Sequence, residues 1–309
     1  MKVLDAQFSD PTSPAAAQVR DRAVGAYLGL AIGDALGATV EFMTPREILD
    51  RHGVHREITG GGWLKLPAGQ VTDDTTMALA LGEAILAYSG RVVPHACASA
   101  FDDWMRAKPV DIGNTVRRNL LTWRRSGVPE APESEHDAGN GAAMRLLPVA
   151  LATFSKDRAL IADANRAQAH VTHHNPLSDA ACEALIGLVH AGLAGCPQLA
   201  GEAVGHLLSR YPVFCPPERE VENPSGYIVH TMHAVLQSLH RRNDFEVALV
   251  DVVNRGGDAD TTGAIVGMVM GARVGVDGIP QRWRDALDPL THQACRTQAL
   301  RLLACASAN

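Results

Sequence analysis

The chain has 309 residues, 46% of them hydrophobic, and a formal net charge of −6. This length and apolar content allow one sizeable hydrophobic core, while the acidic balance gives no general attraction to nucleic acid or to an anionic membrane. Aromatic residues make up only 5% of the chain, which disfavours a platform for stacking nucleic-acid bases. None of the six cysteines belongs to a C-x-x-C pair, so we expect reduced thiols in a cytoplasmic protein.

The first 20 residues are polar and include Pro11 and Pro14, so we expect a flexible tail followed by a single domain over residues 21–309. Beyond the tail, alanine and leucine recur at helical spacing, no Gly-rich dinucleotide fingerprint occurs, and no uninterrupted apolar run reaches the roughly 18 residues of a membrane span. The pattern predicts an all-α fold. The expected helices cover residues 21–42, 73–90, 95–106, 113–127, 141–154, 157–173, 176–195, 200–211, 225–242, 245–257, 261–275 and 281–288.

Two segments carry glycine at every fourth position. Each glycine inside a helix costs about 1 kcal/mol relative to alanine, so four on one face indicate a compensating close contact between helix backbones. Chance drift in a Gly- and Ala-rich sequence is the simpler alternative. We expect both helices at the centre of the fold, which places Asp34 and the segment around Asp258 deep inside it. The glycines are Gly25, Gly29, Gly33 and Gly37 in the first segment, and Gly263, Gly267, Gly271 and Gly275 in the second.

Acidic and hydroxyl side chains open two apolar helices, in "TDDTT" (72–76) and "GGDADTT" (256–262). For either segment alone, helix capping is the simpler interpretation. Together they bring four carboxylates to a core with few lysines, so divalent cations are needed to neutralise them. Donors that are all oxygen favour Mg²⁺, Mn²⁺ or Ca²⁺ over zinc, and two neighbouring ions would use them well. The expected metal ligands are Thr72, Asp73, Asp74, Asp258, Asp260 and Thr261.

Five motifs between residues 22 and 280 give the chain a family resemblance. In order they are "GLAIGDALGATVEF", "TDDTTMAL", "GNGAAMRLLPVAL", "THHNPLSDAA" and "NRGGDADTTGAIVGMVMGA". Together they resemble the ADP-ribosylglycohydrolases. The resemblance implies a compact orthogonal helical bundle with two Mn²⁺ or Mg²⁺ ions in a central cleft. Two further stretches, "TVEFMTPREI" and "ENPSGYIVHTM", look most like the branch that removes ADP-ribose from an arginine of the nitrogenase iron protein and so reactivates it.

The same resemblance implies roles for individual residues. Glu41 matches a mobile acid beside the metals, and Asp34 matches a buried acid behind them. A carboxylate next to two dications has a depressed pKa and is a poor acid, so we expect Asp111 to be the general acid and Glu41 a base or gate, with Asp74 as a third candidate for proton transfer. The residues implied to contact substrate are Gly139, Asn140, Gly141 and Ala142 of a diphosphate cradle, His173, Tyr227, and Asn114, which lies close to Asp111 near the distal ribose.

Simpler interpretations remain for four of these residues. Asp111 and Asn140 are each expected to cap a helix if they do not bind substrate. His173 is then a structural histidine, and Tyr227 a core aromatic.

Three other functions compete with arginine-linked hydrolysis. The first is cleavage of another linkage, in serine-linked ADP-ribose, acetylated ADP-ribose or an ADP-ribosylated base. The second is non-catalytic binding of ADP-ribose. The third is a two-metal phosphatase, whose metal ligands usually include more histidine than these acidic segments contain. The resemblance also implies regulation by a PII-type signalling protein and, through it, recruitment to an ammonium channel at the membrane.

Overall fold

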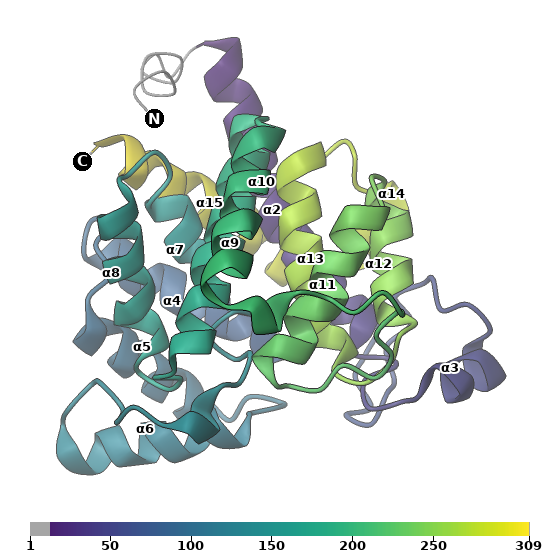
Figure 1. Cartoon of the computed structure of the whole chain (residues 1–309), viewed down its shortest axis with the longest axis horizontal. Helices are drawn as coiled ribbons and strands as arrows, with labels where there is room; N and C mark the ends of the chain where they lie inside the picture. Colours follow the sequence, from purple (N-terminus) through teal and green to yellow (C-terminus); the bar gives the residue numbers. More distant parts are fainter. Residues whose placement is uncertain (1–12, 309) are drawn as a thin grey trace.

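The computed structural model describes residues 13–308 and confirms the all-α prediction (Figure 1). Within that range no strand forms, and β pairing is limited to two isolated bridges, Gly61 with Leu66 and Gly139 with Tyr227. The helices are α2 (Pro14–Gly37), α3 (Pro45–His52), α4 (Asp73–Ala87), α5 (Pro94–Arg106), α6 (Asn114–Ser126), α7 (Leu147–Ala152), α8 (Arg158–Ala169), α9 (Pro176–Ala194), α10 (Pro197–Arg210), α11 (Ile228–Arg241), α12 (Phe245–Val253), α13 (Ala259–Val274), α14 (Gln281–Ala286) and α15 (Pro289–Ala308), with 3₁₀ turns η1 (Glu135–Asp137) and η2 (Pro212–Phe214).

The two glycine-bearing helices, α2 and α13, pack antiparallel with their backbones in contact. A Cβ added to Gly33 would lie 2.0 Å from the carbonyl oxygen of Gly263, and one added to Gly29 would lie 2.1 Å from that of Gly267. No side chain larger than hydrogen fits at such distances. The predicted close approach of these two helices is therefore confirmed.

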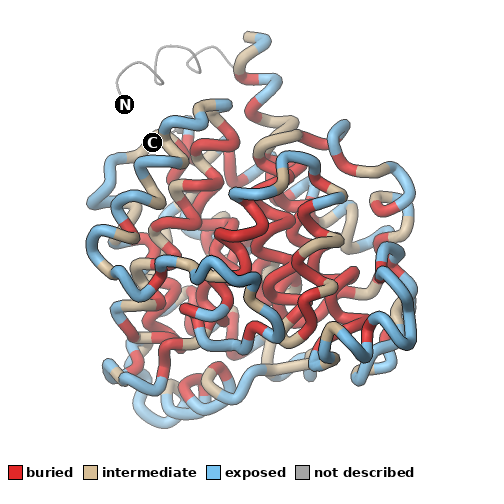
Figure 2. Tube along the Cα trace, turned by 45° about the vertical axis from the view of Figure 1, so that its right-hand side comes forward, coloured by how far each residue is buried: buried red, intermediate tan, exposed pale blue. Residues whose placement is uncertain are grey.

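Both helices of this pair are buried on every side along most of their length, as expected for helices that are apolar all round. Figure 2 shows the buried part of the chain gathered in the middle of the molecule, with exposed segments at the periphery. At one end of the pair Gly37 packs on Ala259, where an added Cβ would lie 2.2 Å from the carbonyl oxygen. The end of α2 thus meets the start of α13, which fixes where the acidic segments lie.

The remaining helices surround this pair in one continuous hydrophobic cluster that runs from Val19 to Ala306. Helix α9 packs on α10 and α13, and α15 packs on α2, α4 and α7. Helix α9 is long and apolar enough to cross a membrane, but 61% of its apolar window is buried inside the protein. Its apolar character is accounted for by this packing.

Several sequence predictions differ from the structure. Residues 14–20, expected in a flexible tail, form the first turns of α2, and residues 1–12 lie outside the described range. The predicted helix at 141–154 begins only at Leu147, because residues 141–145 form turns. Helices α3 and α15 were not predicted at all. The six cysteines are unpaired as expected, and Cys97, Cys182 and Cys295 are buried.

The glycine contact predicts a large, position-specific loss of stability. In Gly33→Val the new side chain meets the backbone of α13, which cannot move aside as a flexible side chain would, so we expect a loss of about 3 kcal/mol or more in the free energy of unfolding. Urea unfolding measures it. Gly205→Ala is the control, because a Cβ there meets nothing within 4 Å and should stabilise α10 by up to about 1 kcal/mol. Equal stability of the two variants would contradict the packing role.

Candidate active site

The start of α4 is capped by Asp34, which reaches it from α2. The Asp34 carboxylate accepts hydrogen bonds from the backbone N–H of Thr72 at 2.9 Å and of Thr75 at 3.1 Å, and from the Thr75 hydroxyl at 2.6 Å. Thr72 occupies the N-cap position, yet its side chain makes no capping bond. Because a residue of another helix satisfies these N–H groups, the Thr72 hydroxyl is free for another role.

The two acid-and-threonine segments converge across the α4–α13 junction. The Thr72 hydroxyl lies 3.3 Å from Asp74 Oδ2 and 3.5 Å from Asp260 Oδ2. The Thr261 hydroxyl lies 3.4 Å from the same Asp74 oxygen. Donors that are 187 or more residues apart in the chain therefore face one centre, as the sequence predicted. Asp258, the N-cap residue of α13, likewise makes no side-chain capping bond.

Two further carboxylates border this centre. Oxygen atoms of Glu41, Asp258 and Asp260 lie within 4.8 Å of one another. The Asn140 amide donates to Asp258 Oδ2 at 2.6 Å and to the Thr231 hydroxyl at 3.0 Å. Asn140 therefore orients Asp258 and does not cap a helix with its side chain.

Burial and mutual repulsion raise the pKa values of these acids. Burial is the largest cause throughout; it raises the pKa of Asp73 to about 7, with the charges of Asp111, Asp34 and Asp258 adding to it. The pKa of Glu41 is raised to about 8 in the same way, and those of Asp74 and Asp260 lie well above their usual range. Clustered carboxyl groups of this kind bind cations favourably, because a nearby positive charge stabilises their ionised form.

One oxygen of the cluster has no partner among the described residues. Asp74 Oδ1 is buried and makes no hydrogen bond, and a buried polar atom without a partner is costly. Carboxylate and hydroxyl oxygens are the donors that hard divalent cations prefer. The donor set and the unsatisfied oxygen fit the expected Mg²⁺ or Mn²⁺, and these residues form a candidate metal-binding group.

Glu41 has a neighbour that the sequence did not indicate. The Trp63 indole N–H donates to Glu41 Oε2 at 2.6 Å, and Glu41 itself is only 5% exposed. Trp63 lies in "GGGWLKL", a turn outside the helices. A tryptophan within a glycine-rich turn that precedes the first acidic motif is the one local signal that marks it.

Asp111 borders the acidic centre, and Asn114 begins α6. The N-cap of that helix is Gly113, so Asp111 is not its cap; its carboxylate accepts from the adjacent Ile112 N–H at 2.7 Å. The charge of Asp111 contributes to the raised pKa values of Asp73 and Glu41, which places it near the cluster. Asn114 is exposed.

The predicted diphosphate cradle is a turn paired with a distant loop. The Asn140 N–H donates to Gly226 O, and the Ile228 N–H donates to Ala138 O, both at 2.9 Å. The N–H of Asn140 is therefore not available to a phosphate. Gly141 and the fully buried Ala142 follow within the turn. Their N–H groups donate to no backbone carbonyl among residues 13–308.

His173 lies directly against this glycine turn. A Cβ added to Gly141 would lie 2.6 Å from His173 Cε1, and one added to Gly139 would lie 3.0 Å from Nε2. Burial, with a smaller effect from Arg145, lowers the pKa of His173 to about 3, so the ring is neutral. The Thr172 hydroxyl lies 2.8 Å from its Nδ1. The glycines thus allow the turn to close over a neutral imidazole.

Tyr227 lies at the surface and not in the core. It is 38% exposed, it is the N-cap residue of α11, and its ring contacts His230 edge to face. The bridge to Gly139 fixes it beside the glycine turn, so its exposed ring is available to a ligand there.

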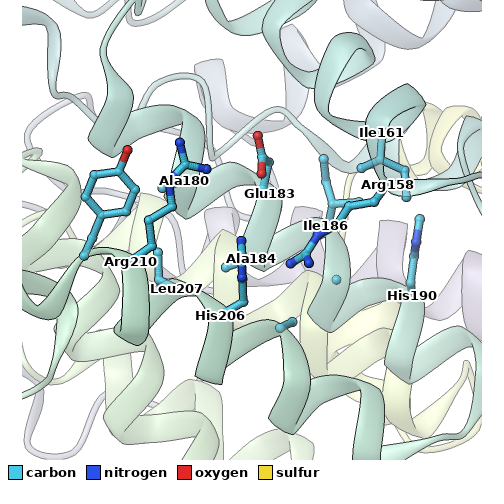
Figure 3. Close-up of a pocket in the computed structure, with 13 residues that line it drawn as sticks. Arg158, Ile161, Ala180, Glu183, Ala184, Ile186, His190, His206, Leu207 and Arg210 are labelled. Atoms are coloured by element: carbon cyan, nitrogen blue, oxygen red, sulfur yellow. The ribbon is translucent and has the colours of Figure 1, made fainter.

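A separate cavity of about 130 Å³ lies among α8, α9 and α10 (Figure 3). It is lined by Glu183, His190, His206 and Arg210 among others, with Ile186 and Leu207 between them. None of the predicted site residues lines it. The candidate active site is therefore the acidic centre and its rim.

Comparison with known proteins agrees with this assignment. The sequence profile of the ADP-ribosylglycohydrolases matches residues 15–308. The ADP-ribosyl-[dinitrogen reductase] glycohydrolase of Rhodospirillum rubrum is 48% identical over 289 residues, which cover 93% of this chain and 97% of that protein. The ADP-ribosylarginine hydrolase Tri1 of Pseudomonas putida (strain GB-1) is 35% identical over 283 residues, 86% of this chain and 74% of that protein.

A solved structure described as an ADP-ribosylglycohydrolase-related protein complex superposes with a TM-score of 0.82 at 34% identity, over 94% of this chain and 99% of that chain. The shared fold, the profile match along nearly the whole chain and the 48% identity agree with one another. The chain belongs to the ADP-ribosylglycohydrolase family.

Proposed function

We propose that this protein hydrolyses the N-glycosidic bond between ADP-ribose and an arginine side chain, and that its substrate is the ADP-ribosylated nitrogenase iron protein, which the reaction reactivates. Both named relatives support this substrate class, since one acts on dinitrogen reductase and the other on ADP-ribosylarginine. The observation that carries the proposal within the structure is the convergence of oxygen donors on Asp74, with one of its oxygens buried and unpaired.

The proposed cofactor is a pair of Mn²⁺ or Mg²⁺ ions. The residues that hold it are Thr72, Asp73, Asp74, Asp258, Asp260 and Thr261, with Asp34 fixing Thr72 from behind. When bound, the ions would supply positive charge that fixes the hydroxyls of the distal ribose and polarises them.

The protons of the reaction are assigned to two carboxyl groups at the rim. Water adds to C1″ of the distal ribose as the bond to the guanidine nitrogen breaks, and the products are ADP-ribose and free arginine. Asp111, which is only half-buried, donates a proton to the departing nitrogen. Glu41, which is held by Trp63, accepts a proton from the water or admits substrate by moving.

The diphosphate is assigned to the glycine turn. Gly141 and Ala142 offer backbone N–H groups there, Gly139 and Asn140 shape the turn, and Asn114 and Tyr227 border the site. His173 supports the turn as a neutral ring. It contacts substrate when the turn moves and exposes the ring. A neutral imidazole adds no charge to a centre already rich in acids.

Location and regulation are proposed from the family resemblance alone. The protein acts in the cytoplasm, and a PII-type signalling protein brings it to an ammonium channel at the membrane, away from its substrate. Cleavage of another linkage and non-catalytic binding are retained as outcomes of the test that follows.

We expect Mn²⁺-dependent release of ADP-ribose from arginine-modified nitrogenase iron protein, and none from a serine-linked substrate. Asp258→Asn should lower the rate at least about 100-fold. Replacing a residue that only hydrogen-bonds to a metal ligand already lowers metal affinity or activity about 10–100-fold. Chromatography of free ADP-ribose measures the release. Asp277→Asn, an exposed acid beyond the other end of α13, is the control. Release only from serine would move the substrate to another linkage, and binding without release would indicate a binding protein.

Asp111→Asn and Glu41→Gln should each lower kcat by about 10²–10⁴-fold, the usual contribution of a positioned acid or base. ADP-ribose affinity should change by less than threefold, since neither residue is assigned to the diphosphate. Single-turnover kinetics and calorimetric titration with ADP-ribose give the two quantities. Full turnover by either variant removes that residue from the proton transfers.

Divalent cations should stabilise the protein more as pH rises. The folded pKa values of Asp73 and Glu41 are raised from 3.8 and 4.5 to about 7 and 8. Raised carboxyl pKa values mean that the native state binds more protons, so the metal-free protein loses stability as pH rises between about 4 and 8. Thermal unfolding at pH 5.5 and pH 8, with EDTA or with Mg²⁺, measures this. A shift in Tm on adding Mg²⁺ that is the same at both pH values would contradict it.

A further inference from the structure

Two aromatic side chains stand exposed beside the buried Glu41. Phe42 is 65% and Trp63 is 51% exposed. Their ring centroids lie 5.5 Å apart at an interplanar angle of 47°. We call Phe42 and Trp63 the aromatic lip. Exposed aromatic rings contribute little to the hydrophobic core, so a pair of them beside the candidate active site indicates a surface that contacts a ligand.

The Phe42 half of the lip is held in place by its backbone. Phe42 has a φ of +63°, a left-handed conformation that bulky residues rarely adopt and that persists only where the surroundings impose it. Its N–H donates to Gly257 O at 2.7 Å, and the Gly257 N–H donates to Met43 O at 3.0 Å. Gly257 precedes the proposed metal ligand Asp258, so the lip is tied to the metal-binding loop.

The Trp63 half is held by a tight turn. Gly61 and Leu66 exchange backbone hydrogen bonds of 2.7 and 2.9 Å, and Leu66 is buried. A Cβ added to Gly62 would lie 2.3 Å from the carbonyl oxygen of Ala38, the residue that follows α2. The turn is therefore pressed against the end of the central helix. Trp63 is presented to solvent on a rigid support.

The chemistry around the lip suits a cation. The lip's indole N–H is bound to Glu41, and the charges of Asp258, Asp111 and Asp73 act on that same carboxyl. A guanidinium is planar and weakly hydrated, and it stacks on aromatic faces while its N–H groups bind carboxylates. The exposed rings of the lip could stack on a guanidinium, and the carboxylates behind them could accept its N–H groups.

We propose that the aromatic lip is the subsite that receives the arginine side chain of the modified protein, and that the Trp63 indole holds Glu41 in place beneath it. The inference rests on the proposed function, whose scissile bond joins that arginine to the sugar. Trp63 is thus a positioning residue for Glu41 as well as a substrate contact. Phe42 contributes a ring face only.

The adenine of ADP-ribose is the competing occupant, since bases also stack on aromatic rings. Its position in the substrate argues against it. Trp63 binds the acid that lies within 4.8 Å of Asp258 and Asp260, where the ribose–arginine bond is expected to lie. The adenine is at the opposite end of the molecule, beyond the diphosphate.

The first test is titration of agmatine, a guanidinium compound, into protein saturated with Mn²⁺ and ADP-ribose. Phe42→Ala and Trp63→Ala should each weaken agmatine binding about tenfold, within the range of a desolvated cation–π contact. ADP-ribose affinity should stay within twofold of wild type. N-carbamoylputrescine, in which a neutral urea replaces the guanidinium and the terminal ammonium is kept, should bind more weakly than agmatine to wild type and lose nothing in either variant.

The second test separates the two roles of Trp63. Trp63→Phe keeps a ring face and removes the N–H, so KM for the arginine-linked substrate should stay within twofold while kcat falls about tenfold, the loss of one hydrogen bond to a charged group. Trp63→Ala should change both. Tyr88→Ala, an exposed aromatic at the far end of α4, is the control and should change neither.

Three results would overturn the inference. These are agmatine affinity unchanged in both alanine variants, no agmatine binding by wild type, and loss of ADP-ribose affinity in place of agmatine affinity, which would assign the lip to adenine. A wild-type protein that releases no ADP-ribose from arginine would instead refute the proposed function. The agmatine titration still decides the lip in that case.

Discussion

The backbone contact between α2 and α13 is the constraint on which the rest of the structure depends. Hydrogen is the only side chain that fits where Gly33 meets Gly263, so the two helices can neither separate nor slide without losing the contact. Their junction, where Gly37 meets Ala259, sets the depth at which α13 begins. The acids at that start cannot spread apart to relieve their repulsion. Their charge must be compensated where they stand, by protons or by cations.

Capping is the second physical feature that shapes the site. Helix starts present N–H groups that need acceptors, and a threonine or aspartate at the N-cap normally supplies one. Here Asp34 supplies it to α4 from another helix. The Thr72 hydroxyl is thereby released to face Asp74 and Asp260. The Thr72 side chain, which would usually cap its own helix, makes no capping bond because Asp34 of α2 accepts from those N–H groups instead.

The sequence was sufficient for features written in short, local patterns. Glycine at every fourth position predicted the central pair, and the two acid-and-threonine segments predicted oxygen donors that converge on one centre, because each signal is confined to one helix or its first residues. Trp63 was not found, since its bond to Glu41 depends on how a turn lies against the end of α2. Helix α3 was missed despite a capping box formed by Thr44 and Glu47, a signal that the sequence did contain.

Two other misses have different causes. The earlier turns of helix α15 bury small or polar side chains, Cys295, Gln298 and Ala299, and its buried leucines, Leu302 and Leu303, lie only in its second half, so its apolar spacing is a weak signal. The contacts of Asn140 were not predicted: its N–H donates to Gly226 O and its side-chain amide donates to Asp258. Those partners are 86 or more residues away along the chain, and only the folded structure brings them together.

The same central contact has a consequence for how the chain is made. Gly25 and Gly271 pack together, but one is near the start of the chain and the other near its end. At synthesis rates of about 5–20 residues per second, roughly 12–50 s separate their emergence. During that interval the glycine face of α2 has no partner, and contacts between residues so distant in sequence form slowly. A ribosome-bound chain that lacks α13 therefore exposes a helix that the finished fold buries along most of its length, and such exposed apolar surface is what chaperones bind.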